Sequence, residues 1–251
     1  MDSKKVEFKG STGETLSAKV DLPNGNIKAY ALFAHCFTCS KDLKAVGNIT
    51  KALAENGIAT FKFDFTGLGQ SSGNFADTNF SGNVGDLVKA YEFMNDEFSA
   101  PSILIGHSLG GAAVLQASHK MNSVKAVATI GAPAEPAHVK ENFEMSIDEI
   151  NEKGEAKVTL AGRPFTIKKQ FIDDLEEARM KKFICDLGKA LIVFHSPIDN
   201  TVGIDNASKI FIAAKHPKSF ISLDKADHLL SEKEDSMYVG KVLATWAEKY
   251  I

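Results

Sequence analysis

Residues 106–111 read GHSLGG, a G-x-S-x-G pattern that is typical of a serine nucleophile on a sharp turn. The pattern follows the apolar run Ile103–Ile105 and precedes a segment rich in Ala and Leu, so we expect a strand before Ser108 and a helix after it. The flanking glycines then let strand and helix approach closely, with the Ser108 hydroxyl above the carboxyl edge of the sheet. In the alternative interpretation, the serine only caps a helix in a glycine-rich turn.

Two backbone N–H groups are candidates for holding the oxyanion that such chemistry creates. The N–H of Leu109 lies at the predicted helix start, where N–H groups are unpaired and the helix dipole favours negative charge. The second donor is expected after the run Ala29–Ala34, where lipases carry an HGGG-type motif and this chain reads HCFTCSKD. We predict the N–H of Phe37 for this role. Cys36 replaces the usual glycine, and we interpret it as a small buried side chain.

A nucleophilic serine needs a base, and the base needs an orienting carboxylate. His228 comes just after the predicted strand Ser219–Leu223, so its imidazole can lie over the same sheet edge, and we predict it as the general base. Asp199 follows the predicted strand Leu191–Phe194 and is the predicted acid, because the chain order serine, acid, histidine is that of α/β hydrolases.

Other residues compete for these two roles. The remaining histidines after Ser108, which fit the base less well, are His119, His138, His195 and His216. The rival carboxylates are Asp205, Asp224 and Asp227. Asp227 adjoins His228, but neighbouring side chains rarely face each other, and Asp205 lies near a predicted helix start, where carboxylates cap.

Cys36 and Cys39 form a C-x-x-C pair, which could be a redox dithiol or half of a zinc site. A zinc site needs a second ligand pair, and the sequence offers none at a suitable spacing. No signal peptide pattern opens the chain, so Cys36, Cys39 and Cys185 are expected to be free thiols in a reducing compartment. We therefore predict a cytoplasmic protein with no metal and no organic cofactor.

The elements that must position these residues are strands alternating with helices, which predicts one mostly parallel sheet with helices on both faces. An antiparallel hairpin is expected first, from Lys4–Lys9 and Leu16–Leu22. The further predicted strands are 29–34, 58–63, 103–105, 124–130, 191–194 and 219–223. The predicted helices are 43–56, 84–95, 109–120, 207–214 and 236–250.

Almost sixty residues between Ile130 and Ala190 break this alternation. They contain a potential hairpin, 156–160 and 164–167 around Ala161-Gly162-Arg163, and a helical pattern over Gln170–Lys182. We expect a hydrolase core of residues 1–132 and 189–251, with a cap insertion of residues 133–188 over the site. The alternative is an ordinary crossover helix with a decorative hairpin.

Composition excludes several classes of protein. The 251 residues include 44% hydrophobic and 24% charged side chains, the balance of a globular protein, and the net charge is -3. That charge argues against nucleic acid as a partner, and the longest apolar runs are far too short to span a membrane. Residues 67–73, GLGQSSG, resemble a dinucleotide fingerprint but space the last glycine one residue too far, so we expect a loop beside the site.

Taken together, these residues resemble the α/β-hydrolase superfamily over the whole chain. The segments HCFTCSKD (35–42) and GHSLGGAA (106–113) look, more narrowly, like the hydrolase half of bifunctional hydrolase/OsmC-type proteins. In that group the hydrolase is commonly fused to an OsmC-like domain, which detoxifies organic hydroperoxides through cysteines. The resemblance implies an α/β-hydrolase fold, serine-esterase activity and an OsmC-like protein or domain as a partner.

The sequence therefore predicts a serine hydrolase of the carboxylesterase type that cleaves a small or medium ester through Ser108, His228 and Asp199. A thioesterase or a peptidase would use the same three residues. Two alternatives from other classes stay open: a redox module that uses Cys36 and Cys39, and a non-catalytic binding protein on a hydrolase scaffold.

Overall fold

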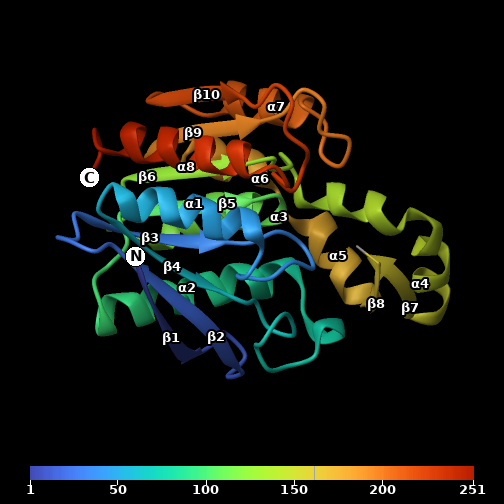
Figure 1. The fold of residues 1–251 in the computed structure, drawn as a ribbon. Coiled ribbons are helices and arrows are strands. Elements are labelled where there is room, and N and C mark those ends of the chain that lie inside the picture. Colours follow the sequence, from blue (N-terminus) through green and yellow to red (C-terminus); the bar gives the residue numbers. More distant parts are fainter. Residues whose placement is uncertain (161) are drawn as a thin grey trace.

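A computed structural model describes residues 1–160 and 162–251. Within these residues, eight strands form one sheet in the order β1-β2-β4-β3-β5-β6-β9-β10 (Figure 1). The strands are β1 (Asp2–Lys9), β2 (Thr15–Leu22), β3 (Ala29–Ala34), β4 (Ile58–Phe63), β5 (Ile103–His107), β6 (Ala126–Ile130), β9 (Ala190–His195) and β10 (Lys218–Ser222). The predicted hairpin and the mostly parallel sheet are confirmed, since within this sheet only β1–β2 and β2–β4 pair in antiparallel fashion.

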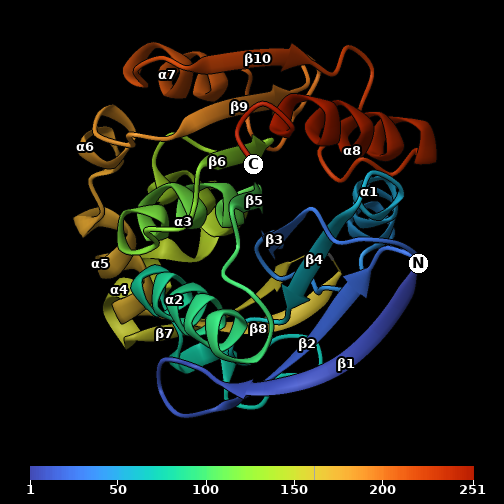
Figure 2. The same ribbon diagram turned by 90° about the vertical axis from the view of Figure 1, so that its left-hand side faces the viewer.

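Helices cover both faces of the sheet because the central strands are apolar on both sides. The side chains of Ala31 and Phe33 lie in one hydrophobic cluster with α1 (Lys44–Glu55) and α8 (Lys233–Ala247). Leu32 and Ala34, one residue further along β3, lie in the opposite cluster. That cluster includes the helices α2 (Phe80–Glu97), α3 (Leu109–Ala117) and α7 (Asp205–Ala213) (Figure 2). The carboxyl ends of the parallel strands are thereby left as the open edge of the sheet.

The segment between β6 and β9 holds more regular structure than its sequence predicts. It contains a 3-10 helical stretch (Pro136–Ser146), α4 (Ile147–Lys153), β7 (Glu155–Leu160), β8 (Arg163–Lys168), α5 (Lys169–Glu177) and α6 (Met180–Cys185). The hairpin of β7 and β8 is confirmed. Ala161, which the sequence-based prediction included in this hairpin, lies outside the described residues. The single helix predicted over Gln170–Lys182 is wrong: the backbone is extended at Ala178, which separates α5 from α6.

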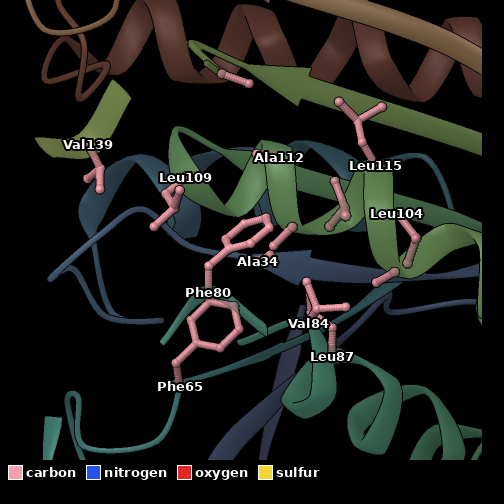
Figure 3. Packing of buried hydrophobic residues seen from close by; sticks show 14 of the residues in the cluster. Ala34, Phe65, Phe80, Val84, Leu87, Leu104, Leu109, Ala112, Leu115 and Val139 are labelled. Atoms are coloured by element: carbon pink, nitrogen blue, oxygen red, sulfur yellow. The ribbon is translucent and has the colours of Figure 1, made fainter. Parts of the chain in front are cut away.

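This segment gathers at the end of the sheet toward which β3 and β9 point (Figure 1). Its buried side chains join the same hydrophobic cluster as α2 and α3, and Figure 3 shows Val139 beside Leu109 within that cluster. The shared core fixes the segment against the body of the protein. Across the described residues, no helix combines the length and the apolar character that a membrane span requires.

The packing of α8 on α1 gives a stability test with an internal control. A methyl group at Gly240 would lie 2.8 Å from the Ile49 carbonyl oxygen and 2.7 Å from the Ala52 side chain, whereas one at Gly47 would meet no atom within 4 Å. We expect Gly240→Ala to lower the free energy of unfolding by about 1–3 kcal/mol through overpacking. Gly47→Ala should raise it by about 0.5–1 kcal/mol, because alanine is the better helix former. Urea unfolding of both variants measures these changes in the free energy of unfolding. Equal effects of the two substitutions would contradict the close contact of α8 with α1 at Gly240.

Candidate active site

The turn that carries Ser108 joins β5 directly to α3, as the sequence predicts. Its backbone has φ 54° and ψ −126°, in a region that residues other than glycine seldom adopt. A side chain at Gly110 would lie 2.5 Å from the carbonyl oxygens of Ala34 and His35, so glycine is required there for α3 to approach β3. The Ser108 N–H donates to the Ile130 carbonyl at 2.8 Å, which fixes the turn against β6.

The structure brings Ser108, His228 and Asp199 together at the carboxyl edge of the sheet. His228 lies in the loop after β10, and its Nε2 is 3.0 Å from the Ser108 Oγ. Its Nδ1 is 2.7 Å from Oδ2 of Asp199, which lies in the loop after β9. Since the carboxylate can only accept, Nδ1 carries the proton and Nε2 presents its lone pair to the serine hydroxyl.

The Asp199 carboxylate is almost completely buried and is held by its own loop. Its Oδ1 accepts the backbone N–H groups of Thr201 and Val202, each at 2.9 Å. Burial alone would raise the pKa of Asp199, but the His228 hydrogen bond and these two N–H groups outweigh it and hold the pKa below its usual value. The carboxylate therefore stays ionised beside the imidazole.

The three rival carboxylates are bonded elsewhere. Asp227 accepts the Ser231 N–H at 2.8 Å, and Asp205 pairs with Lys209 at 2.6 Å. Asp224 accepts the Ser222 hydroxyl at 2.6 Å. Among the carboxylates that the structure describes, Asp199 is the one hydrogen-bonded to the His228 ring.

Two buried histidines, His107 and His195, support the site in a role that the sequence did not predict. His107 lies at the end of β5, and its Nε2 bonds the His228 carbonyl oxygen at 2.7 Å. His195 lies at the end of β9, where its Nε2 bonds the Val202 carbonyl oxygen at 2.7 Å. Each ring thus braces the loop that carries either His228 or Asp199. Their only signal in the sequence is a position at the end of an apolar strand, which is too weak to assign a role.

The two cysteines of the loop after β3 are not free thiols, contrary to the prediction from the sequence. Cys36 and Cys39 form a disulfide, so the prediction of three free thiols is wrong for this pair, whereas Cys185 is free. The reason is a tight turn in which the Cys39 N–H donates to the Cys36 carbonyl at 3.1 Å and Thr38 has φ 62°. This turn brings the two Cα atoms to 5.3 Å, within the span of a disulfide.

The base of this loop is anchored by a buried ion pair. The Lys41 ammonium lies 2.5 Å from Oδ2 of Asp64, and both side chains are almost fully buried. The Lys41 N–H also donates to Asp64 Oδ1, at 2.7 Å. The glycine-containing loop 67–73 closes around the same carboxylate, because the Gln70 N–H donates to it at 2.9 Å and Gly69 leaves no room for a side chain.

A cavity of about 230 Å³ opens above the Ser108 hydroxyl. The oxyanion candidates Phe37 and Leu109 both line it, and in the described part of the chain neither backbone N–H donates a hydrogen bond. The residues between β6 and β9 supply much of its opposite wall: Pro133, His138, Val139, Asn142 and Leu160. The described residues contain no group of three or more His, Cys, Asp or Glu side chains placed to hold a metal ion.

This sheet, with its serine turn, defines an α/β-hydrolase fold. The Hydrolase_4 family model, described as serine aminopeptidase S33, matches residues 26–153, and the chain belongs to this family. The esterase domain of a Rhodothermus marinus protein is 49% identical, with 100% of this chain and 99% of that chain covered and a TM-score of 0.81. The chain is therefore an esterase-type α/β hydrolase. No curated protein matched it.

More distant solved structures share the fold alone. Est1E from Butyrivibrio proteoclasticus with bound ferulic acid is 18% identical, with 98% of this chain and 99% of that chain covered and a TM-score of 0.79. Mouse alpha/beta hydrolase domain-containing protein 10 is 21% identical over 98% of this chain and 99% of that chain, with a TM-score of 0.81.

The buried histidines predict how stability depends on pH. Burial lowers the pKa values of His35, His107 and His195, that of His107 to about 3. Below about pH 6.5 the unfolded chain therefore binds protons that the folded protein does not, and the free energy of unfolding falls as the pH falls. His107→Gln keeps an N–H donor but has no titrating group at this position. Its free energy of unfolding should therefore fall by about 2 kcal/mol less between pH 7 and pH 5 than that of the wild type.

Urea unfolding at the two pH values measures this loss for each protein. His216→Gln, at an exposed histidine, is the matched control and should show the wild-type loss. A loss in His107→Gln as large as that of the wild type would contradict the assignment of His107 as a buried neutral ring.

Proposed function

We propose that the protein is a carboxylesterase that cleaves small or medium esters through an acyl-enzyme on Ser108. The observation that carries this proposal is the continuous hydrogen-bonded chain from Asp199 through His228 to Ser108, which ends at the floor of an apolar cavity. This arrangement supplies a nucleophile, its base and the group that orients the base.

In the proposed reaction, His228 Nε2 takes the hydroxyl proton while Ser108 Oγ attacks the ester carbonyl carbon. The imidazolium, stabilised by the Asp199 carboxylate, then gives this proton to the departing alkoxide, and the alcohol leaves. Water enters, loses a proton to the same Nε2 and attacks the acyl carbon. Collapse of that second intermediate releases the carboxylic acid and restores the serine.

The negative charge of both tetrahedral intermediates falls on the former carbonyl oxygen. We assign its stabilisation to the backbone N–H groups of Leu109 and Phe37, two residues that line the same cavity as Ser108. The Leu109 N–H also lies at the first turn of α3, where the helix dipole favours an anion.

The lining and the volume of the cavity favour a substrate whose acyl or alcohol group is uncharged and of modest size. Its wall is mostly apolar, including Val139, Leu160, Val202 and Leu229, and its volume of about 230 Å³ restricts chain length. An aminopeptidase must bind the α-ammonium group of its substrate, yet the described residues that line the cavity include no carboxylate. This favours an ester over a peptide with a free amino terminus.

Residues 133–188 act, in this proposal, as a cap that selects the substrate, since they form one wall of the cavity. The similarity of residues 35–42 and 106–113 to hydrolase/OsmC-type proteins supports an OsmC-like protein or domain as a partner. The relative at 49% identity is itself described as an esterase domain of a protein. A cytoplasmic location stays a prediction.

The nucleophile is tested with a fluorophosphonate probe, which phosphonylates activated serines. We expect the folded protein to be labelled and Ser108→Ala to lose both labelling and hydrolysis of a short-chain nitrophenyl ester. Ser81→Ala, at an exposed serine of α2, is the control and should be labelled like the wild type. Labelling that persists in Ser108→Ala would place the nucleophile elsewhere.

The acid is tested by comparing two neighbouring carboxylates. Asp199→Asn should lower kcat for the same ester by about 10⁴-fold, because the amide holds the imidazole in the wrong tautomer. Asp227→Asn, next to His228 in sequence but bonded to Ser231, should change kcat by less than about tenfold. A reversed order of the two effects would make Asp227 the orienting acid.

A further inference from the structure

The Cys36–Cys39 disulfide stands inside the candidate active site but has no part in the proposed hydrolysis. Both cysteines line the same cavity as Ser108 and His228. The residues enclosed by the bridge are Phe37 and Thr38, and Phe37 supplies one of the two proposed oxyanion donors. The redox state of this pair therefore acts on a group that would touch the reacting oxygen.

The two sulfur-bearing residues differ in access. Cys36 is only 3% exposed, whereas Cys39 is half-buried at the cavity wall. A thiolate that enters the cavity can reach Cys39 more readily than Cys36. A disulfide that is accessible at a functional site is of the labile or regulatory kind, in contrast to one buried in a core.

The bridge holds a backbone conformation that the sequence does not favour. Thr38 has φ 62°, a left-handed value that is a genuine outlier for a β-branched residue. Such a conformation persists only where the surroundings over-determine it. Here the disulfide closes the turn on one side, and the Arg163 guanidinium, from β8, donates to the Thr38 carbonyl on the other.

The loop has other anchors, which do not depend on the disulfide. On one side, His35 Nδ1 bonds the Cys36 carbonyl oxygen at 2.8 Å, and on the other Lys41 is paired with Asp64. These contacts keep the ends of the loop in place when the bridge opens. The segment of Phe37 and Thr38 then keeps the Arg163 hydrogen bond but loses its covalent closure. It can therefore relax toward ordinary backbone angles, which moves the peptide groups beside Phe37.

We propose that the Cys36–Cys39 disulfide is a redox switch on the oxyanion loop, opened by a dithiol reductant and closed by a disulfide oxidant. A reductant thiolate attacks Cys39 Sγ, the sulfur–sulfur bond breaks, and Cys36 leaves as a thiolate. The second thiol of the reductant then attacks the mixed disulfide and releases Cys39. Two electrons and two protons pass to the protein, and the reductant becomes a disulfide.

This inference rests on the proposed esterase function and predicts which kinetic constant changes. The oxyanion forms only along the reaction path, so a displaced Phe37 N–H weakens the transition state more than the bound ester. Loss of one oxyanion donor costs about 10²–10³-fold in kcat. Because the donor is displaced rather than removed, we expect the reduced protein to lose between about tenfold and about 10³-fold in kcat, while KM changes by less than about twofold.

Dithiothreitol is the probe, and maleimide counting reports the state of the bridge. Each sample is freed of dithiothreitol and unfolded in urea before labelling, so that the buried Cys36 is also counted. Cys185 alone should then react with maleimide in the oxidised protein, and all three cysteines should react in the protein that was reduced while folded. Nitrophenyl ester kinetics and the rate of fluorophosphonate labelling are then measured in both states. Both rates should fall on reduction and return when oxidised dithiothreitol closes the bridge again.

Two variants separate the bridge from other effects of the reductant. Cys185→Ser keeps the bridge and should respond to dithiothreitol like the wild type. The double variant Cys36→Ser/Cys39→Ser cannot form the bridge, so it should show the rates of the reduced protein under every condition. Circular dichroism of each protein establishes that the fold is retained.

Three outcomes overturn the switch while leaving the esterase proposal intact. These are equal rates in both redox states, a bridge that dithiothreitol does not open in the folded protein, and a double variant as active as the oxidised wild type. A folded protein that the fluorophosphonate does not label in either state would instead refute the esterase function, and the switch with it.

Discussion

The backbone of Ser108 is the constraint on which the rest of the site depends. A non-glycine residue at φ 54° costs about 1–3 kcal/mol, and the chain keeps it there through contacts that tolerate no alternative. Gly110 permits the close approach of α3 to β3, and the Ser108 N–H is bonded to the Ile130 carbonyl. Contacts with β3 and β6, the two strands that flank β5, thus keep Ser108 in this conformation, and its hydroxyl lies at the carboxyl edge of the sheet as a result.

The site also requires an ionised carboxylate and neutral histidine rings close to one another in the protein interior. Asp199 keeps its charge because two backbone N–H groups and the His228 ring compensate for lost water. His107 and His195 stay neutral because burial disfavours their charged forms, and each bonds a backbone carbonyl instead. A neutral ring next to His228 avoids repulsion with the imidazolium that forms during the proposed reaction.

The sequence predicted most of the sheet from its short apolar runs, and it predicted the members of the hydrogen-bonded chain because each of them follows a predicted strand. The carboxyl ends of parallel strands meet at one edge of a sheet, so the sequence alone was enough to predict that Ser108, Asp199 and His228 lie close together. The helical stretch over 136–153 was missed because its few buried residues, such as Val139 and Ile150, are hidden among charged ones. The disulfide was missed because it depends on the left-handed backbone of Thr38, which no local pattern reveals.

The contacts of residues 133–188 with the two loops of the site also escape sequence reasoning, because they join residues far apart in the chain. His138 Nε2 bonds the Thr201 carbonyl at 2.9 Å, and Thr201 in turn donates its N–H to Asp199. Arg163 bonds the Thr38 carbonyl inside the bridged turn. One contact therefore acts on the loop of the acid and the other on the loop of the proposed oxyanion donor. A movement of this segment that breaks the first contact would act on the loop of Asp199, and one that breaks the second would act on the loop of Phe37. The position of this segment and the geometry of the candidate site are therefore coupled.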